Sequence, residues 1–265
     1  MSYEHIQLIR DGHIATLKLN RPETRNAMSI AMGEEVARAV EAVRDDADIR
    51  VLVVTGEGKS FSAGGDLGML AADAGLGEAT HPGMGGPPRE FYKRYLSVAT
   101  LPIPTVAAIN GHAIGAGMCF ALACDLRIAA SDAKMGMTFT KLGIHPGMGA
   151  TYFLPRLIGV ARACDLLFTG RIIDAEEAEQ LGILNRVVAR EGLPAAIETL
   201  AEELAAAAPI AVRLVKRAVY RGIEHSLADA LDLESAQQAA TFQTADAKEG
   251  IRAVMEKRAP KFLGK

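Results

Sequence analysis

Apolar residues near the start of the chain form short runs that are separated by turn-forming or helix-capping residues. The runs at 6–10 and 14–19 flank Asp11-Gly12, a residue pair typical of a tight turn, and they predict a β-hairpin. Ser29 is a good helix cap, and valines recur behind it with the spacing of one helical face. We therefore expect a hairpin followed by an amphipathic helix.

Three later runs are apolar without alternation. They cover residues 51–55, 105–109 and 126–129 and are rich in β-branched or small side chains. Continuous apolar runs of this length are typical of parallel strands that are buried on both faces. Because helical patterns lie between them, the first two-thirds of the chain predicts an α/β fold.

The remaining segments divide into one long loop and a helical end. Residues 71–88 contain several glycines and prolines without a sustained apolar period, which predicts a mobile surface loop, a lid or a binding loop. From Ala161 the composition favours helices, which we expect at 191–208, 209–221, 226–242 and 245–257. The expected organisation is an α/β core over 1–200 and a helical C-terminal portion over 201–265.

Composition limits the partners that the chain can take. The 265 residues include 29 Lys and Arg against 32 Asp and Glu, a net charge of −3. Such a balance gives no electrostatic reason to bind nucleic acid or an anionic membrane, and we expect neither as a partner. No apolar run is long enough to span a bilayer, and the first residues lack the pattern of a signal peptide. We therefore expect a cytoplasmic protein.

Several familiar motifs are incomplete in this chain. Cys119, Cys124 and Cys164 lack zinc-ligand spacing and are interpreted as reduced core thiols, so no metal site is expected. The glycine-rich segments do not match a P-loop or a dinucleotide fingerprint. Ser62 is one residue out of place for a hydrolase nucleophile, and packing beneath a tight turn is the favoured interpretation.

Two segments share a pattern in which a buried strand leads into small residues and then into a helix. The first contains 61–67 (FSAGGDL) and the second 110–117 (NGHAIGAG). The first N–H groups of a helix have no partner within it, and small residues let a ligand oxygen approach them closely. Two such N–H groups directed at one point form an oxyanion hole, although each segment alone is also compatible with an ordinary tight turn.

In this order and at this separation, the segments resemble the crotonase (enoyl-CoA hydratase/isomerase) superfamily. The resemblance covers nearly the whole chain. It rests on six segments that match family motifs: Arg21–Met28 (RPETRNAM), Phe61–Leu67, Asn110–Gly117, Cys124-Asp125, Gly143–Gly147 (GIHPG), and Glu249-Gly250 with Glu256–Arg258 (EKR).

The resemblance implies a spiral of ββα units with C-terminal helices that form trimers or hexamers. It also implies a CoA thioester ligand, with coenzyme A as part of the substrate and no separate cofactor. The thioester carbonyl would be held by the N–H groups of Gly65 and Ala116. Arg25 and Lys257 match positions near the CoA phosphates or adenine, with Lys257 reaching the ligand of a neighbouring subunit; both are also compatible with solvated surface charge. The other expected substrate contacts are Ala63, Asp66, Leu67, Cys119 and Phe139, and for Asp66 helix capping is the favoured role.

The chain departs from the family where hydratases carry two catalytic glutamates. Cys119 and Phe139 occupy these positions, and neither replaces a carboxylate, because a buried thiol is a poor acid or base and Phe has no proton to transfer. His145 is the candidate acid or base, since imidazole titrates near neutral pH. The expected function is therefore an acyl-CoA enzyme that stabilises a thioester enolate, nominally an enoyl-CoA hydratase. An isomerase, a decarboxylase, a thioester hydrolase and a non-catalytic acyl-CoA binder remain as alternatives.

Overall fold

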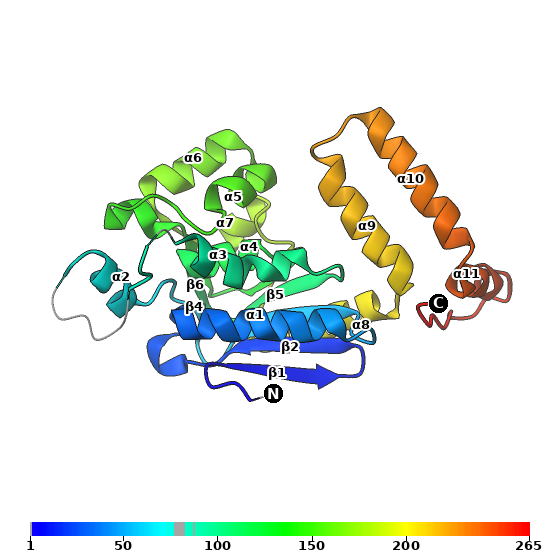
Figure 1. The fold of residues 1–265 in the computed structure, drawn as a ribbon, viewed down its shortest axis with the longest axis horizontal. Helices are drawn as coiled ribbons and strands as arrows, with labels where there is room; N and C mark the ends of the chain where they lie inside the picture. The colour runs from blue at the N-terminus through cyan, green and yellow to red at the C-terminus, as the bar shows by residue number, and fades with distance from the viewer. Residues whose placement is uncertain (1, 77–82, 87) are drawn as a thin grey trace.

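The computed structural model describes residues 2–76, 83–86 and 88–265, and places most strands in one large sheet (Figure 1). This sheet has the order β1-β2-β3-β5-β7-β10, and all of its neighbouring pairs after the β1–β2 hairpin are parallel. Its strands are β1 (Ile6–Asp11), β2 (Ile14–Leu19), β3 (Val51–Gly56), β5 (Thr105–Ile109), β7 (Leu126–Ala130) and β10 (Arg186–Val188). The hairpin and the three buried strands expected from the sequence are confirmed, although Asp11 belongs to the strand and the turn is Gly12-His13.

A second, smaller sheet lies beside the first and has the order β4-β6-β8-β9. Its strands are β4 (Ser60–Ser62), β6 (His112–Ile114), β8 (Lys134–Gly136) and β9 (Ile172–Asp174). After β3, β5 and β7 enter the large sheet, the chain passes each time into a short strand of the small sheet. This repetition generates the spiral arrangement that the family resemblance implies.

Helices cover both faces of the large sheet. The helices of the described chain are α1 (Ile30–Asp45), α2 (Leu67–Asp73), α3 (Arg89–Leu96), α4 (Ala116–Leu122), α5 (Ala150–Ile158), α6 (Val160–Thr169), α7 (Ala175–Gln180), α8 (Leu193–Ala206), α9 (Pro209–Gly222), α10 (Leu227–Phe242) and α11 (Ala245–Met255). Short 3-10 turns lie at Pro22–Thr24, Ser97–Thr100, Thr138–Leu142 and Arg190–Gly192. Ser29 caps α1, as expected, by accepting a hydrogen bond from the Met32 N–H.

The strand β3 shows why its sequence carries no alternation. Leu52 and Val54 pack into the main core, whereas Val51 and Val53 pack against α8 on the opposite face. Since each face is covered, every position from 51 to 54 is apolar. The expected boundary between residues 200 and 201 falls inside α8, a helix that packs against the large sheet.

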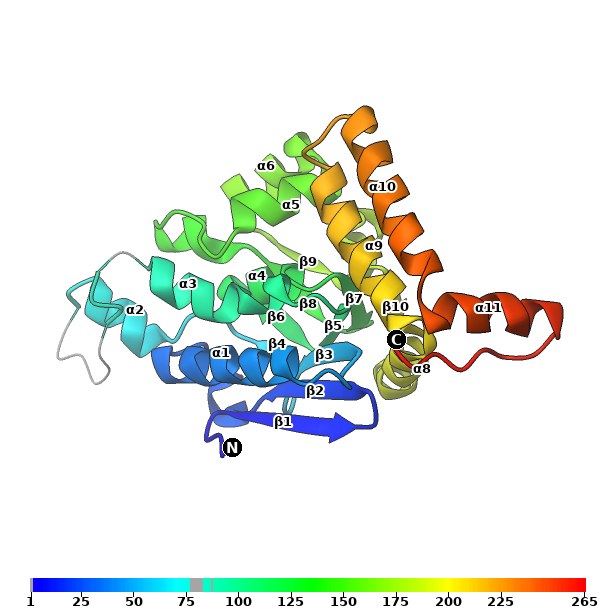
Figure 2. The same ribbon diagram turned by 45° about the vertical axis from the view of Figure 1, so that its right-hand side comes forward.

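The helices α9 and α10 leave the α/β body as an antiparallel pair, with α11 beyond them (Figures 1 and 2). The pair is attached to the body through Asp125, at the start of β7. Its carboxylate accepts hydrogen bonds from the Lys216 ammonium and the Tyr220 hydroxyl, both at 2.7 Å. The Lys216 ammonium also donates to the Ile103 carbonyl at 2.8 Å, so one side chain joins α9 to two segments of the body.

The expected loop at 71–88 is shorter at its start than the sequence indicated. Residues 71–73 belong to α2, whose N-terminus is stabilised by the Asp66 side chain. The part of the prediction that concerns residues 77–82 and 87 lies outside the described residues. The next described helix, α3, begins at Arg89.

Candidate active site

Two neighbouring strands of the small sheet lead into the two glycine-rich turns. β4 and β6 are parallel neighbours, and Gly64-Gly65 and Gly115-Ala116 follow their carboxyl ends. The carboxyl ends of parallel strands meet at one edge of a sheet, where α/β proteins commonly bind ligands. The fold therefore brings together two turns that are about fifty residues apart in the sequence.

Glycine is required at two points of these turns. Gly115 has φ 53° and ψ −119°, a combination that side chains other than hydrogen rarely allow. Gly64 has φ 98°, and a Cβ there would lie 2.7 Å from the carbonyl oxygen of Ile114. The two turns thus pack backbone against backbone.

This packing leaves two amide groups without a partner. Within the part of the chain that the structure describes, the N–H groups of Gly65 and Ala116 donate no hydrogen bond. Their neighbours are bonded: the Gly64 N–H donates to the Ser62 hydroxyl at 3.2 Å, and the Gly115 N–H donates to the carbonyl of Gly136 at 2.7 Å. Both Gly65 and Ala116 line one cavity of about 270 Å³.

The cavity is largely apolar. Its lining comes from the turns after β4 and β6, from α2 and α3, and from the segment around Thr138–Leu142. The apolar side chains that line it are Leu67, Met69, Leu70, Met84, Phe91, Phe139, Leu142, Ile144 and Met148. Among the described residues that line it there is no Asp, Glu, Lys or Arg.

The structure brings six of the expected site residues to this cavity: Ala63, Gly65, Leu67, Ala116, Phe139 and His145. His145 is exposed at the rim, where its Nδ1 lies 2.7 Å from the carbonyl oxygen of Pro146. Phe139 is half-buried, and the buried part of its side chain packs against the core.

The other four expected residues do not line the cavity. Asp66 caps α2 by accepting hydrogen bonds from the N–H groups of Gly68 and Met69, so the capping interpretation is confirmed. Cys119 is completely buried; its thiol donates weakly to the carbonyl of Gly147 at 3.5 Å, and burial holds its pKa far above the ordinary value for a thiol.

Arg25 and Lys257 are both exposed and both adopt left-handed backbone conformations, with φ 55°. The Arg25 carbonyl accepts a hydrogen bond from the N–H of Ala63, so its loop borders the cavity. Lys257 follows α11, which lies at the opposite end of the molecule from α2 in Figure 1.

Sequence reasoning missed Tyr92 and Thr138, whose hydroxyl-bearing side chains also line the cavity. For Tyr92 the sequence offered one signal. Phe91 and Tyr95 lie on one face of the helix at 89–96, so the adjacent Tyr92 is expected at the edge of the core. Ser62 is completely buried and donates its hydroxyl proton to the Asn26 carbonyl at 2.8 Å, which confirms packing beneath the turn.

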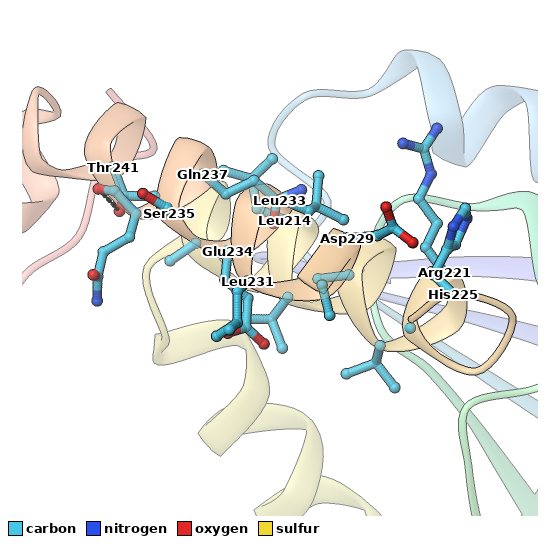
Figure 3. Close-up of a pocket in the computed structure, with 17 residues that line it drawn as sticks. Leu214, Arg221, His225, Asp229, Leu231, Leu233, Glu234, Ser235, Gln237 and Thr241 are labelled. Atoms are coloured by element: carbon cyan, nitrogen blue, oxygen red, sulfur yellow. Dashed lines mark hydrogen bonds between the residues drawn. The ribbon is translucent and has the colours of Figure 1, made fainter. Parts of the chain in front are cut away.

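A larger hollow of about 900 Å³ lies between α9 and α10, away from the two glycine-rich turns (Figure 3). Leucine and valine side chains of both helices face it, together with the polar side chains of Arg221, His225 and Asp229 near one end. Among the described residues, no group of three or more His, Cys, Asp or Glu side chains is arranged to hold a metal ion. Also among these residues, no helix has both the length and the apolar character that a membrane crossing requires.

A spiral of ββα units with two partner-free amides at one cavity defines an α/β protein of the crotonase fold. The family model for enoyl-CoA hydratase/isomerase matches residues 10–265. The chain therefore belongs to the enoyl-CoA hydratase/isomerase family of enzymes.

Similar proteins support this assignment over the full length. The chain is 38% identical over 266 residues to a crotonyl-CoA hydratase of Syntrophomonas wolfei, with all of both chains covered. It is 41% identical over 261 residues to a mitochondrial enoyl-CoA hydratase domain-containing protein of Mus musculus, covering 95% of this chain and 85% of the relative.

Solved structures agree with both comparisons. An enoyl-CoA hydratase of Bacillus anthracis superposes with a TM-score of 0.89 at 38% identity, covering 99% of this chain and 100% of the other. An enoyl-CoA hydratase of Polaromonas superposes with a TM-score of 0.90 at 31% identity, covering 97% and 99%.

Proposed function

We propose that this enzyme binds an acyl-CoA thioester with its carbonyl oxygen between the N–H groups of Gly65 and Ala116. The observation that carries the proposal is that both amides lack a partner within the described part of the chain and line the same cavity. Two fixed donors stabilise the negative charge that develops on a thioester oxygen when an enolate forms. Coenzyme A enters as part of the substrate, and the reaction needs no separate cofactor.

The lining of the cavity favours an uncharged, apolar acyl group. Leucine, methionine and phenylalanine side chains supply most of the surface, and no Lys or Arg side chain among the described residues that line the cavity is available to pair with a terminal carboxylate. Burying an unpaired charge in such surroundings would be costly.

Standard hydration is less well supported than enolate formation. Hydration of a 2-enoyl thioester uses one group to activate water and another to protonate carbon. The described lining contains no carboxylate, and Cys119 is buried behind it with its thiol against Gly147. Isomerisation, decarboxylation and thioester hydrolysis need fewer such groups and remain candidates beside hydration. The same absence of carboxylates favours a second candidate, a protein that binds acyl-CoA without turning it over.

The variant Ala116→Pro tests the proposal directly. Ala116 is the first residue of α4, where proline is well tolerated because that N–H has no helical partner. The substitution removes the proposed donor and places a ring carbon where the oxygen would sit. We expect kcat to fall about 10²- to 10³-fold, the effect of losing one oxyanion donor. Ala116→Gly is the matched control because it keeps the N–H group and should keep activity.

The assay follows a panel of enoyl, malonyl and aryl-acyl CoA thioesters by absorbance, with calorimetric measurement of binding beside it. Turnover that is lost in Ala116→Pro and kept in Ala116→Gly supports the enzyme. Tight binding without turnover across the panel supports the binder. Equal behaviour of Ala116→Pro and the unaltered protein would overturn the placement of the thioester.

We also propose that the chain forms a homotrimer or a hexamer through its C-terminal helices. Large apolar side chains are exposed on α9, α10 and α11: Val215, Val219, Leu227, Leu231, Phe242, Ile251 and Val254. Such a concentration on helices that leave the body supports burial against other copies. In that assembly Lys257 would reach the CoA of a neighbouring subunit while Arg25 contacts the CoA of its own. Light scattering should give three or six times 28.0 kDa, and a monomer at micromolar concentration would refute the proposal.

A further inference from the structure

Three side chains that carry an exchangeable proton line the proposed acyl cavity. They are Tyr92, Thr138 and His145. An enolate bound there must receive a proton at carbon before the product leaves, so one of these groups or water must supply it. The three side chains differ in their burial and in the groups that they contact, and these differences decide which of them can act as the proton donor.

Tyr92 lies on α3 and directs its hydroxyl towards Gly147. A Cβ built on Gly147 would overlap that hydroxyl and lie 2.7 Å from the ring carbon that bears it, so the phenol rests on the glycine backbone. On its other side the same glycine meets Cys119, whose thiol contacts the Gly147 carbonyl at 3.5 Å. The phenol therefore occupies the cavity wall directly in front of the buried thiol.

The Tyr92 hydroxyl is free to act. It forms no hydrogen bond with any residue in the described part of the chain, whereas the phenol of Tyr95, one turn later, donates to the Ser29 carbonyl at 2.7 Å. Tyr92 is half-buried, and both burial and the nearby Cys119 thiol raise its pKa, which keeps the proton on the phenol at neutral pH. It is a protonated donor whose hydroxyl makes no hydrogen bond to any of the described residues.

The two other candidates are less well placed. His145 is exposed at the rim and has one ring nitrogen against the Pro146 carbonyl, so solvent competes at its remaining nitrogen. Thr138 is an aliphatic alcohol and a much weaker acid than a phenol, and its hydroxyl lies towards Gly115, 3.8 Å from the position of a Cβ there.

We infer that Tyr92 is a further catalytic residue, the donor that delivers the proton to the α-carbon of the thioester enolate. The inference rests on the proposed function. In the step, the enolate electron pair forms the new C–H bond, the carbonyl double bond is restored, and the phenol O–H bond breaks. The resulting phenolate takes a proton from water, which returns the enzyme to its starting state.

Exchange of the α-protons of phenylacetyl-CoA in D₂O tests the step without requiring net turnover. This thioester has an uncharged apolar acyl group and a comparatively acidic α C–H bond. By reversibility, a group that protonates the α-carbon also removes a proton from it. We expect Tyr92→Phe to exchange about 10²-fold more slowly than the unaltered protein, with an unchanged Kd for phenylacetyl-CoA.

Tyr95→Phe is the matched control, since it makes the same chemical change on the same helix but outside the cavity lining. It should lose stability through its hydrogen bond to Ser29 and retain the exchange rate. Tyr92→Phe loses no hydrogen bond within the described residues and keeps its ring beside Phe91, at 6.3 Å between centroids, so its thermal unfolding should be unchanged.

The outcomes separate this inference from the proposed function. If Tyr92→Phe exchanges as fast as the unaltered protein while Ala116→Pro does not, the proton donor is wrong and the thioester site stands. If the unaltered protein shows no exchange above the spontaneous rate, the proposed enolate chemistry fails and the inference fails with it. Slow exchange in Tyr92→Phe together with weakened binding would also overturn the inference, because it would indicate a structural role.

Discussion

The loop before α1 depends on Asn26, and replacing this residue is the sharpest test of how the site is held in place. Asn26 is completely buried. Its amide oxygen accepts a hydrogen bond from the Arg21 N–H at 2.9 Å, and its amide nitrogen donates to the carbonyls of Glu57 and Ser60 at 3.0 and 2.8 Å. The side chain thus joins the loop to the turn between β3 and β4.

The expected loss of stability follows from these three bonds. Each contributes about 1 kcal/mol net, and removing the side chain leaves three main-chain groups without their partner. Asn26→Gly should therefore lower the free energy of unfolding by about 3 kcal/mol. Asn26 also has φ 56°, a conformation that alanine tolerates less well than glycine, so Asn26→Ala should lose about 1 kcal/mol more.

Denaturant unfolding at one fixed protein concentration measures both variants. Thr24→Ala serves as the control in the same loop, because it removes a single half-buried hydrogen bond to the Arg21 carbonyl and should cost less than about 1 kcal/mol. If Asn26→Gly loses less than about 1 kcal/mol, the three bonds do not hold the loop as described. Equal losses in the glycine and alanine variants would refute the contribution of the backbone conformation.

Two further predictions concern titratable groups. A disulfide reagent should label Cys164 first in the folded protein, because Cys119 and Cys124 are buried and burial raises the pKa of Cys124 to about 12; mass spectrometry showing early modification of either buried thiol would contradict this. Hydrogen bonds from the Arg258 guanidinium and the Lys261 N–H lower the pKa of Glu249 to about 2 from its usual 4.5. This carboxylate therefore stabilises the folded C-terminus above pH 4.5 and loses that effect as the pH falls towards 2. Unfolding measured over that range should show the advantage over Glu249→Gln shrinking, and a constant difference would disprove the assignment.

The sequence predicts the central strands β3, β5 and β7 of the large sheet well because each is a run of mostly apolar residues. Residues 51–54 are apolar at every position, which only a strand covered on both faces requires, and the structure places α8 on one face and the main core on the other. The second sheet could not be predicted, because β4, β6 and β8 have three residues each and so short a segment shows no periodicity. Its position depends on pairing between distant parts of the chain.

Some parts of the candidate site could likewise be predicted from the sequence and others could not. The segments that contain Gly65 and Ala116 could be found from sequence because small residues after a buried strand mark a place where the backbone can meet a ligand, whereas the choice of these two residues rested on the family resemblance. For Tyr92 the helical pattern indicates only a position at the edge of the core, because the contact of its hydroxyl with Gly147 joins segments more than fifty residues apart. The way in which α9 is joined to the body could not be predicted from the sequence either. The contacts of Asp125 with Lys216 and Tyr220 join residues about ninety positions apart.

The two partner-free amides belong to the main chain, and this has a consequence for how the protein can change. At positions 65 and 116 every residue except proline carries a backbone N–H group, so the proposed hold on a carbonyl oxygen does not depend on which side chains those two positions carry. If the proposed site is correct, side chains at positions such as 92, 119 and 139 could be exchanged one at a time, which would alter proton transfer while the thioester stays bound in the same way. A scaffold of this type can acquire a new reaction without first losing its ability to bind.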